Sequence, residues 1–190
     1  MKIDPVRLEG PRVVVRSTRI EDARRFVAYH ERNRAHLAPW EPAREDAFYT
    51  ESYWTERLRR YEEDRERGTG QRFVIELGEE LAGLLSLFDL EARDPTWRGR
   101  VGYSLDAGAE GRGLMSEALG LVVRYAFDVL NLKRLQAGYQ PQNARSARVL
   151  ERAGFVKEGY HREFFYVRGA WHDHVDTSLL NRAWRAPQKP

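Results

Sequence analysis

The sequence contains no cysteine, which excludes disulfide bonds, thiolate metal sites and a covalent cysteine intermediate. It has no apolar run long enough to cross a bilayer, and no apolar stretch precedes a cleavage-site pattern near its start. No Ser/Pro-rich linker or internal repeat divides the 190 residues. These absences favour one cytoplasmic domain over residues 1–190 without membrane contact. Its core is expected at about 11–182, with a frayed tail at 186–190.

Charge of one sign is also scarce. The chain has 32 basic and 29 acidic side chains, and this excess of +3 does not indicate a nucleic-acid partner. The arginines of residues 57–67 alternate with acidic residues, which is typical of a solvated helix face. Only His172 and His174 lie close together among the histidines, and two histidines are too few to predict a metal site.

Apolar runs and helical periodicities alternate along the chain. A helical crossover after Leu105 makes the next strand a parallel neighbour, whereas short turns make antiparallel neighbours. The order therefore predicts an α/β fold of the α+β type, with a mixed, mostly antiparallel sheet and helices on both faces. Two prolines make residues 35–42 an expected irregular loop. Strands are expected at 12–16, 71–77, 81–90, 97–105, 134–139, 155–160, 164–167 and 171–179, and helices at about 18–34, 46–67, 114–129 and 143–153.

A glycine-containing loop, Glu110–Met115, joins a strand to the longest apolar helix. The first amides of a helix have no intrahelical partner and carry partial positive charge, so a loop without β-carbons lets a phosphate approach them. The alternative is a tight turn whose glycines serve only the backbone, and the loop alone does not decide between the two. The apolar stripe of the helix consists of Leu114, Ala118, Leu121, Val122, Tyr125 and Val129.

Several motifs follow one another in a recognisable order. The strand, Gly-x-Gly loop, helix and strand, followed by Asn143-x-x-Ser146, resemble the GNAT superfamily of N-acetyltransferases. Within it, the chain is similar to the RimJ/RimL branch from about Val13 to Leu180. The segments that carry this closer likeness are NRAHLAPWEP at 33–42, GLMSEAL at 113–119, GFVKEGY at 154–160 and WHDHV at 171–175.

The resemblance implies that a splayed pair of strands holds acetyl-CoA, the acetyl donor. The pyrophosphate would lie on the amides of Gly111, Arg112, Gly113, Met115 and Ser116, and the pantetheine would pair with Tyr103, Ser104 and Leu105. Asn143 would hold the pantetheine and Ser146 would meet the departing sulfur. An asparagine before a helix is also an N-cap, and the two roles are compatible.

The sequence departs from the superfamily loop at Glu110 and Met115. Neither change removes an amide from the phosphate site. Glu110, however, brings a negative charge near an anionic ligand. Its side chain must therefore point away from the ligand or pair with a base such as Arg112.

The resemblance also implies acetylation of the N-terminal residue, Ala or Ser, of a ribosomal or other protein. Without a cysteine, direct attack by the amine in a ternary complex is the simplest route. An α-amine with a pKa of about 8 is partly neutral at pH 7, whereas a lysine at about 10.4 is not, and this favours an N-terminal acceptor. Alternatives are a small amine, such as an antibiotic or amino-acid conjugate, and a non-catalytic acyl-CoA-binding module. The chain is expected to be a monomer or homodimer.

The sequence offers three candidates for the general base, Glu41, Glu163 and Asp173. Each lies in a segment that could line the acceptor side of the cleft. Trp40 and Glu41 could instead surround the acceptor ammonium, and His174 is a further candidate for acceptor binding. Each has an equally plausible structural role.

Overall fold

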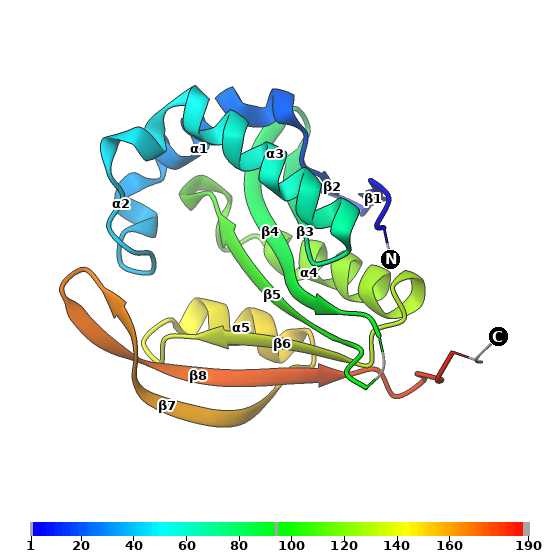
Figure 1. Cartoon of the computed structure of the whole chain (residues 1–190). Helices are drawn as coiled ribbons and strands as arrows, with labels where there is room; N and C mark the ends of the chain where they lie inside the picture. The colour runs from blue at the N-terminus through cyan, green and yellow to red at the C-terminus, as the bar shows by residue number, and fades with distance from the viewer. Residues whose placement is uncertain (1, 94, 188–190) are drawn as a thin grey trace.

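The computed structural model describes residues 2–93 and 95–187, and its strands form one eight-stranded sheet (Figure 1). Residues 188–190 of the predicted tail lie outside the described residues. Neighbouring strands are antiparallel except β5 and β6, which confirms the predicted mixed sheet. The sheet order is β1 (Arg7–Glu9), β2 (Val14–Ser17), β3 (Gln71–Leu77), β4 (Glu80–Glu91), β5 (Arg98–Leu105), β6 (Arg134–Tyr139), β8 (Ala170–Leu180) and β7 (Val156–Val167).

Helices cover both faces of the sheet, as predicted. Val74 on β3 packs into an apolar cluster with Phe26 and Trp54, whereas its neighbours Phe73 and Ile75 belong to a second cluster on the opposite face. This alternation follows from the two-residue period of a strand. Figure 1 shows α1 and α3 on the near face and α4 behind the sheet. The helices are α1 (Ala23–Arg32), α2 (Arg34–Leu37), α3 (Glu51–Arg67), α4 (Leu114–Arg124) and α5 (Ala144–Arg152).

The predicted stripe of the central helix is correct up to Tyr125 and wrong at Val129. Leu114 is 1% and Tyr125 5% exposed, but Val129 is 66% exposed. The reason is that α4 changes into a π-helical turn over Tyr125–Val129. A π-turn takes more residues per turn than an α-helix, so the following side chains rotate away from the buried stripe.

Two other expectations are corrected locally. The segment 35–42 is not wholly irregular, because α2 continues to Leu37. Pro39 removes only its own amide and restricts the residue before it, so the preceding turn can form. The two strands expected at 155–160 and 164–167 are one long strand, β7, whose pairing with β8 shifts register between His161 and Phe165.

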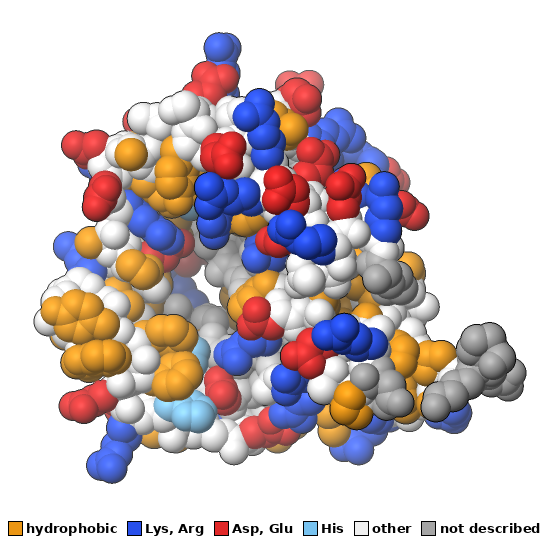
Figure 2. All heavy atoms as spheres, in the orientation of Figure 1, with side chains coloured by type: hydrophobic (Ala, Val, Ile, Leu, Met, Phe, Trp, Pro, Cys, Tyr) orange, Lys and Arg blue, Asp and Glu red, His pale blue; other side chains and the backbone are white. Residues whose placement is uncertain are grey.

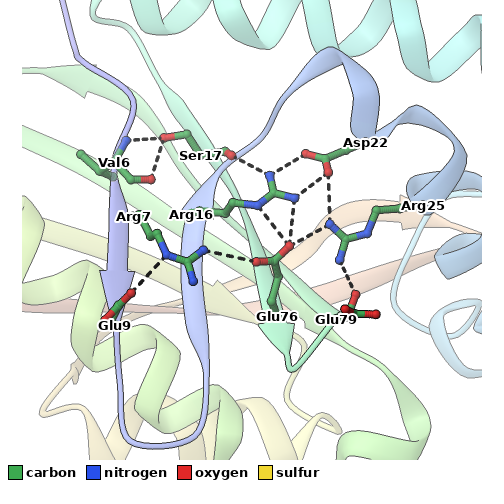
Figure 3. Close-up of polar contacts among 9 residues, drawn as sticks. All are labelled: Val6, Arg7, Glu9, Arg16, Ser17, Asp22, Arg25, Glu76 and Glu79. Carbon is green, nitrogen blue, oxygen red and sulfur yellow. Dashed lines mark hydrogen bonds and ion pairs between the residues drawn. The ribbon is translucent and has the colours of Figure 1, made fainter.

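A buried ion-pair network connects the first strands to the start of α1 (Figure 3). Arg16 on β2, 6% exposed, donates to Asp22 at 2.7 Å and lies 2.9 Å from Glu76 on β3. Arg25 on α1 donates to Glu76 at 2.8 Å. Burial alone would raise the pKa of Asp22, but the hydrogen bonds from Arg16 and the Arg19 amide outweigh burial and lower it. The network therefore fixes where α1 begins relative to the sheet.

The parallel strands β5 and β6 separate soon after they meet. They pair only from Arg98–Arg134 to Arg100–Gln136, whereas β5 stays paired with β4 to Leu105 and β6 with β8 to Tyr139. Figure 1 shows the two strands diverging. The edge of β5 after Arg100 therefore faces a gap instead of a strand, and the predicted splayed pair is confirmed.

Candidate active site

A cleft of about 610 Å³ opens where β5 and β6 separate. Its walls come from the end of β5, the glycine loop with the start of α4, the start of α5, and α2 with the turn that follows. These segments are far apart in sequence, and the sheet order brings them together. The predicted donor-site residues that line the cleft are Tyr103, Ser104, Leu105, Gly111, Gly113, Met115, Ser116, Asn143 and Ser146.

The glycine loop has the conformation that its sequence requires. Gly111 and Gly113 both have φ near +74°, in the left-handed region that favours glycine. Gly113 is the N-cap of α4, and Glu117 is the first amide to bond back, to the Gly113 carbonyl at 3.1 Å. The preceding amides, including those of Met115 and Ser116, have no intrahelical acceptor and lie at the cleft. This arrangement fits a phosphate group.

Arg12, which sequence reasoning missed, stabilises this loop from outside. Its Nη1 donates to the Arg112 carbonyl at 2.6 Å and its Nε to Glu117 Oε2 at 2.7 Å. Glu117 Oε1 also accepts from the amides of Arg12 and Val13. Burial would raise the pKa of Glu117, but these hydrogen bonds outweigh it and lower the pKa. Arg112 does not line the cleft with its neighbours; its carbonyl is held by Arg12.

Asn143 and Ser146 begin α5 on the opposite wall. Asn143 Oδ1 accepts from the Ser146 amide at 3.0 Å, so the predicted N-cap is confirmed. The Asn143 Nδ2 group donates to no atom within the described part of the chain and is available to a ligand. Ser146 Oγ lies 3.0 Å from the hydroxyl of Tyr103 across the gap. Burial raises the pKa of Tyr103 to about 12, so this phenol stays protonated at neutral pH.

Glu110 pairs with basic groups, as expected, but not with Arg112. Its carboxylate lies 2.7 Å from Arg145 Nη1 on α5 and 3.5 Å from His36 Nε2 on α2. The folded chain places these side chains, distant in sequence, closer to Glu110 than its neighbour two positions away. Arg148 also lines the cleft and forms no ion pair with any described carboxylate. The cleft thus has positive charge available although Glu110 lies in it.

The second face of the same strands carries another cavity, of about 260 Å³, beneath α1 and α3. Tyr103, Ser104 and Glu41 line both this cavity and the cleft. The Tyr29 hydroxyl donates to Ser104 Oγ at 2.9 Å, and burial raises the pKa of Tyr29. Glu41 lies 3.2 Å from Arg44. A ligand in the cleft and one in the cavity would therefore approach each other at these shared residues.

Of the remaining candidates from the sequence, the structure brings only part to the cleft. Trp40 lines the cleft, but Glu163, Asp173 and His174 lie in the β7–β8 hairpin and do not. Asp173 accepts from the Glu163 amide at 2.9 Å and from the Tyr160 hydroxyl. His174 packs against Phe165, and burial lowers its pKa. Of the carboxylates considered as general base, Glu41 alone borders the cleft.

Neither a metal-binding cluster nor a membrane-spanning helix is found in the described residues. Within 2–93 and 95–187, no group of three or more His, Cys, Asp or Glu side chains is arranged to hold a metal ion. Among the helices of the same residues, none is both long and apolar enough to span a bilayer.

Comparison with known proteins agrees with this geometry. A family model described as an acetyltransferase (GNAT) domain matches residues 12–156. The chain is 36% identical to the [ribosomal protein uS5]-alanine N-acetyltransferase of Escherichia coli K12, over 96% of this chain and 94% of that protein. The solved ribosomal-protein-S5-alanine acetyltransferase of Vibrio fischeri matches with a TM-score of 0.91 and 38% identity, over 95% of this chain and all of that chain. Mycobacterium smegmatis RimJ, solved with CoA-disulfide, matches with a TM-score of 0.85 and 26% identity, over 95% and 88%. The chain therefore belongs to the GNAT acetyltransferase family, within which it resembles the RimJ/RimL branch.

Proposed function

We propose that this protein transfers an acetyl group from acetyl-CoA to the α-amine at the N-terminus of another protein, a ribosomal protein beginning with Ala or Ser being the first candidate. The observation that carries the proposal is the pair of hollows that share Tyr103, Ser104 and Glu41. One has the features of a donor site and the other opens on the opposite face. The names of the uS5-alanine acetyltransferases among its relatives favour a protein acceptor.

The donor side is built from main-chain groups. The unpaired edge of β5 after Arg100 offers amides and carbonyls to a pantetheine arm, as a neighbouring strand would. The left-handed Gly111 and Gly113 direct the first amides of α4 toward a pyrophosphate. When bound, acetyl-CoA supplies the acyl group as an activated thioester. Asn143 Nδ2 and the guanidinium of Arg148 are the side-chain groups best placed to hold it.

The chemical step needs only modest help from side chains. An α-amine is partly neutral at pH 7, so Glu41 acting through a water molecule is a sufficient base. Tyr103 keeps its proton, and the adjacent Ser146 hydroxyl can donate a hydrogen bond where negative charge develops on the departing sulfur. Glu163 and Asp173 are weaker candidates because they do not line the cleft. Trp40 and His174 remain candidates for acceptor contacts.

The proposal is tested by measuring thiol release from acetyl-CoA with short peptides that begin with Ala, Ser or Met. Free lysine and polyamines serve as competing acceptors. We expect thiol release with the peptides and little release by reaction at the side-chain amine of lysine, because that amine is almost fully protonated at pH 7. Absence of release with every α-amine, in protein that binds CoA by calorimetry, would contradict the proposal. Faster turnover of a small amine than of any peptide would reassign the acceptor. Light scattering would test the expected monomer or homodimer.

A further inference from the structure

The cavity beneath α1 and α3 has a chemical character of its own, and we name it the arginine–aromatic pocket. It extends from Tyr103 and Ser104, beside the cleft, to Arg57 and Arg72 at its far end. Trp54 and His30 form part of its wall, among other aromatic side chains. Figure 2 shows this face of the molecule hollowed between α3 and the β7–β8 hairpin, with Lys and Arg side chains on the α3 side.

The pocket contains more positive than negative charge. Arg44, Arg57 and Arg72 line it, and Glu41 is the one carboxylate among its described lining residues. Glu41 pairs with Arg44, so its charge is already compensated. Arg57 and Arg72 form no ion pair with any described carboxylate. A net positive charge in a low-dielectric hollow attracts a ligand of the opposite sign.

Arg72 is held in place although no described carboxylate lies within ion-pair distance of it. Its Nη1 donates to the Leu87 carbonyl at 3.0 Å, and its guanidinium lies 5.0 Å from the Tyr61 ring centre. Burial lowers the pKa of Arg72, and the neighbouring Tyr61 hydroxyl and Asp64 carboxylate only partly offset this effect. A cation that is partly removed from water without a directly paired counter-ion costs free energy, and a bound anion would reduce this cost. The remaining N–H groups of the planar guanidinium suit a carboxylate.

Two buried polar atoms in the same pocket also lack a partner. Trp54 Nε1 and His30 Nε2 make no hydrogen bond with the described residues, although Trp54 is only 4% and His30 5% exposed. Burial lowers the pKa of His30 to about 4, so its ring is neutral. The two rings stack at 4.7 Å. Both nitrogens are themselves inaccessible, so a ligand in the pocket meets the faces and edges of these neutral aromatic rings, and the polar contacts must come from the arginines.

We infer that the arginine–aromatic pocket selects acceptors that carry a carboxylate close to the acetylated amine, with Arg57 and Arg72 as its binding groups. This inference rests on the proposed function and specifies its substrate class. It explains why two guanidiniums without a carboxylate at ion-pair distance line a pocket that reaches the cleft. The carboxylate of the acceptor can be an acidic side chain or the C-terminus of a very short peptide. The experiment below distinguishes these two.

The sheet register sets where the carboxylate lies. Arg72, Ser86 and Gly102 are paired in one row across β3, β4 and β5, and β5 borders the gap. Two strand spacings of about 4.8 Å separate the ends of this row. An extended chain advances about 3.3 Å per residue. If the amine of an acceptor lies at the gap, the side chain of its second or third residue can therefore reach the guanidinium of Arg72.

The experiment compares kcat/KM for C-terminally amidated peptides that begin with Ala and carry Glu, Gln or Lys at position 2 or 3. We expect the Glu peptide at the preferred position to exceed its Gln counterpart by about tenfold or more, the factor of one charge-assisted hydrogen bond, with Lys lowest. A short peptide with a free C-terminus, compared with its amide, tests the second source. Equal kcat/KM for Glu, Gln and Lys, with no gain from a free C-terminus, would overturn the inference and leave the proposed function intact.

Variants assign the effect to the pocket. Arg72→Gln and, independently, Arg57→Gln should reduce the Glu-to-Gln ratio toward one; Arg57 is exposed, so its replacement is less of a risk to folding. Arg59→Gln is the matched control, because Arg59 is on the same helix, does not line the pocket, and should leave the ratio unchanged. CoA affinity measured by calorimetry on each variant verifies folding. If the Glu-to-Gln ratio of kcat/KM stays unchanged in both pocket variants, groups other than Arg57 and Arg72 recognise the acidic side chain, and the inference is wrong.

Discussion

The glycine loop allows a sharp test, because the same chemical change should have opposite effects at two positions. Gly113 has φ near +74°, and a β-carbon there would meet Arg12 Nη2 at 3.6 Å, an ordinary contact. The cost of Gly113→Ala is therefore the left-handed backbone itself, about 1–2 kcal/mol. Gly120 lies inside α4, and its added β-carbon would come no closer than 3.8 Å to Arg124. Gly120→Ala should therefore stabilise the protein by up to about 1 kcal/mol.

Urea unfolding would measure both free energies, and calorimetry the affinity for CoA. If the strained loop of Gly113→Ala relaxes to another conformation, the amides of Met115 and Ser116 turn away and the CoA affinity should fall about tenfold, as expected when only a fraction of the protein is competent to bind. Gly120→Ala should bind CoA as the native protein does. Equal stability changes in the two variants, or unchanged CoA affinity in Gly113→Ala, would refute this account of the loop.

Three further predictions follow from side chains described above. The pKa of Asp22 and that of Glu76 are lowered in the folded state, so their stabilisation is present above about pH 4, where the unfolded carboxylates ionise, and is lost as pH falls through the folded values. Urea midpoints from pH 7 to 3 should therefore fall less steeply in Asp22→Asn than in the native protein. Asn143→Ser should keep the cap but lose the Nδ2 donor, and so lower CoA affinity with little change in stability, whereas Asn143→Ala should also lose about 1 kcal/mol of stability in urea. Equal stability of the two Asn143 variants would argue against the cap. If Glu41 is the general base, Glu41→Gln should lower kcat without changing the affinity for CoA. Steady-state kinetics would measure kcat and calorimetry the CoA affinity, and an unchanged kcat would exclude Glu41 as the base.

Some features of the site depend on only a few adjacent residues. The left-handed loop at Gly111 and Gly113 and the cap at Asn143 are of this kind, since backbone conformation and capping involve residues at most a few positions apart. Where tertiary packing intervened, local patterns failed. Val129 continues the helical period in sequence but is exposed, because the helix widens into a π-turn. Glu163 and Asp173 looked equivalent to Glu41 in sequence, but only Glu41 borders the cleft.

By itself, the sequence determined most of the order of strands and helices, the glycine loop before the central helix and the family resemblance, because these follow from periodicity, glycine positions and motifs along the chain. It did not predict the short strand β1 or the helical turn of α2. Only the tertiary structure decided which distant groups meet. Arg12 reaches Glu117 across 105 positions, Glu110 pairs with Arg145 and His36 instead of Arg112, and Arg72 aligns with Gly102 through the sheet register. Such contacts depend on strand order and on the separation of β5 from β6. No local pattern contains that information, because a side chain's partners are set by which strands lie beside its own.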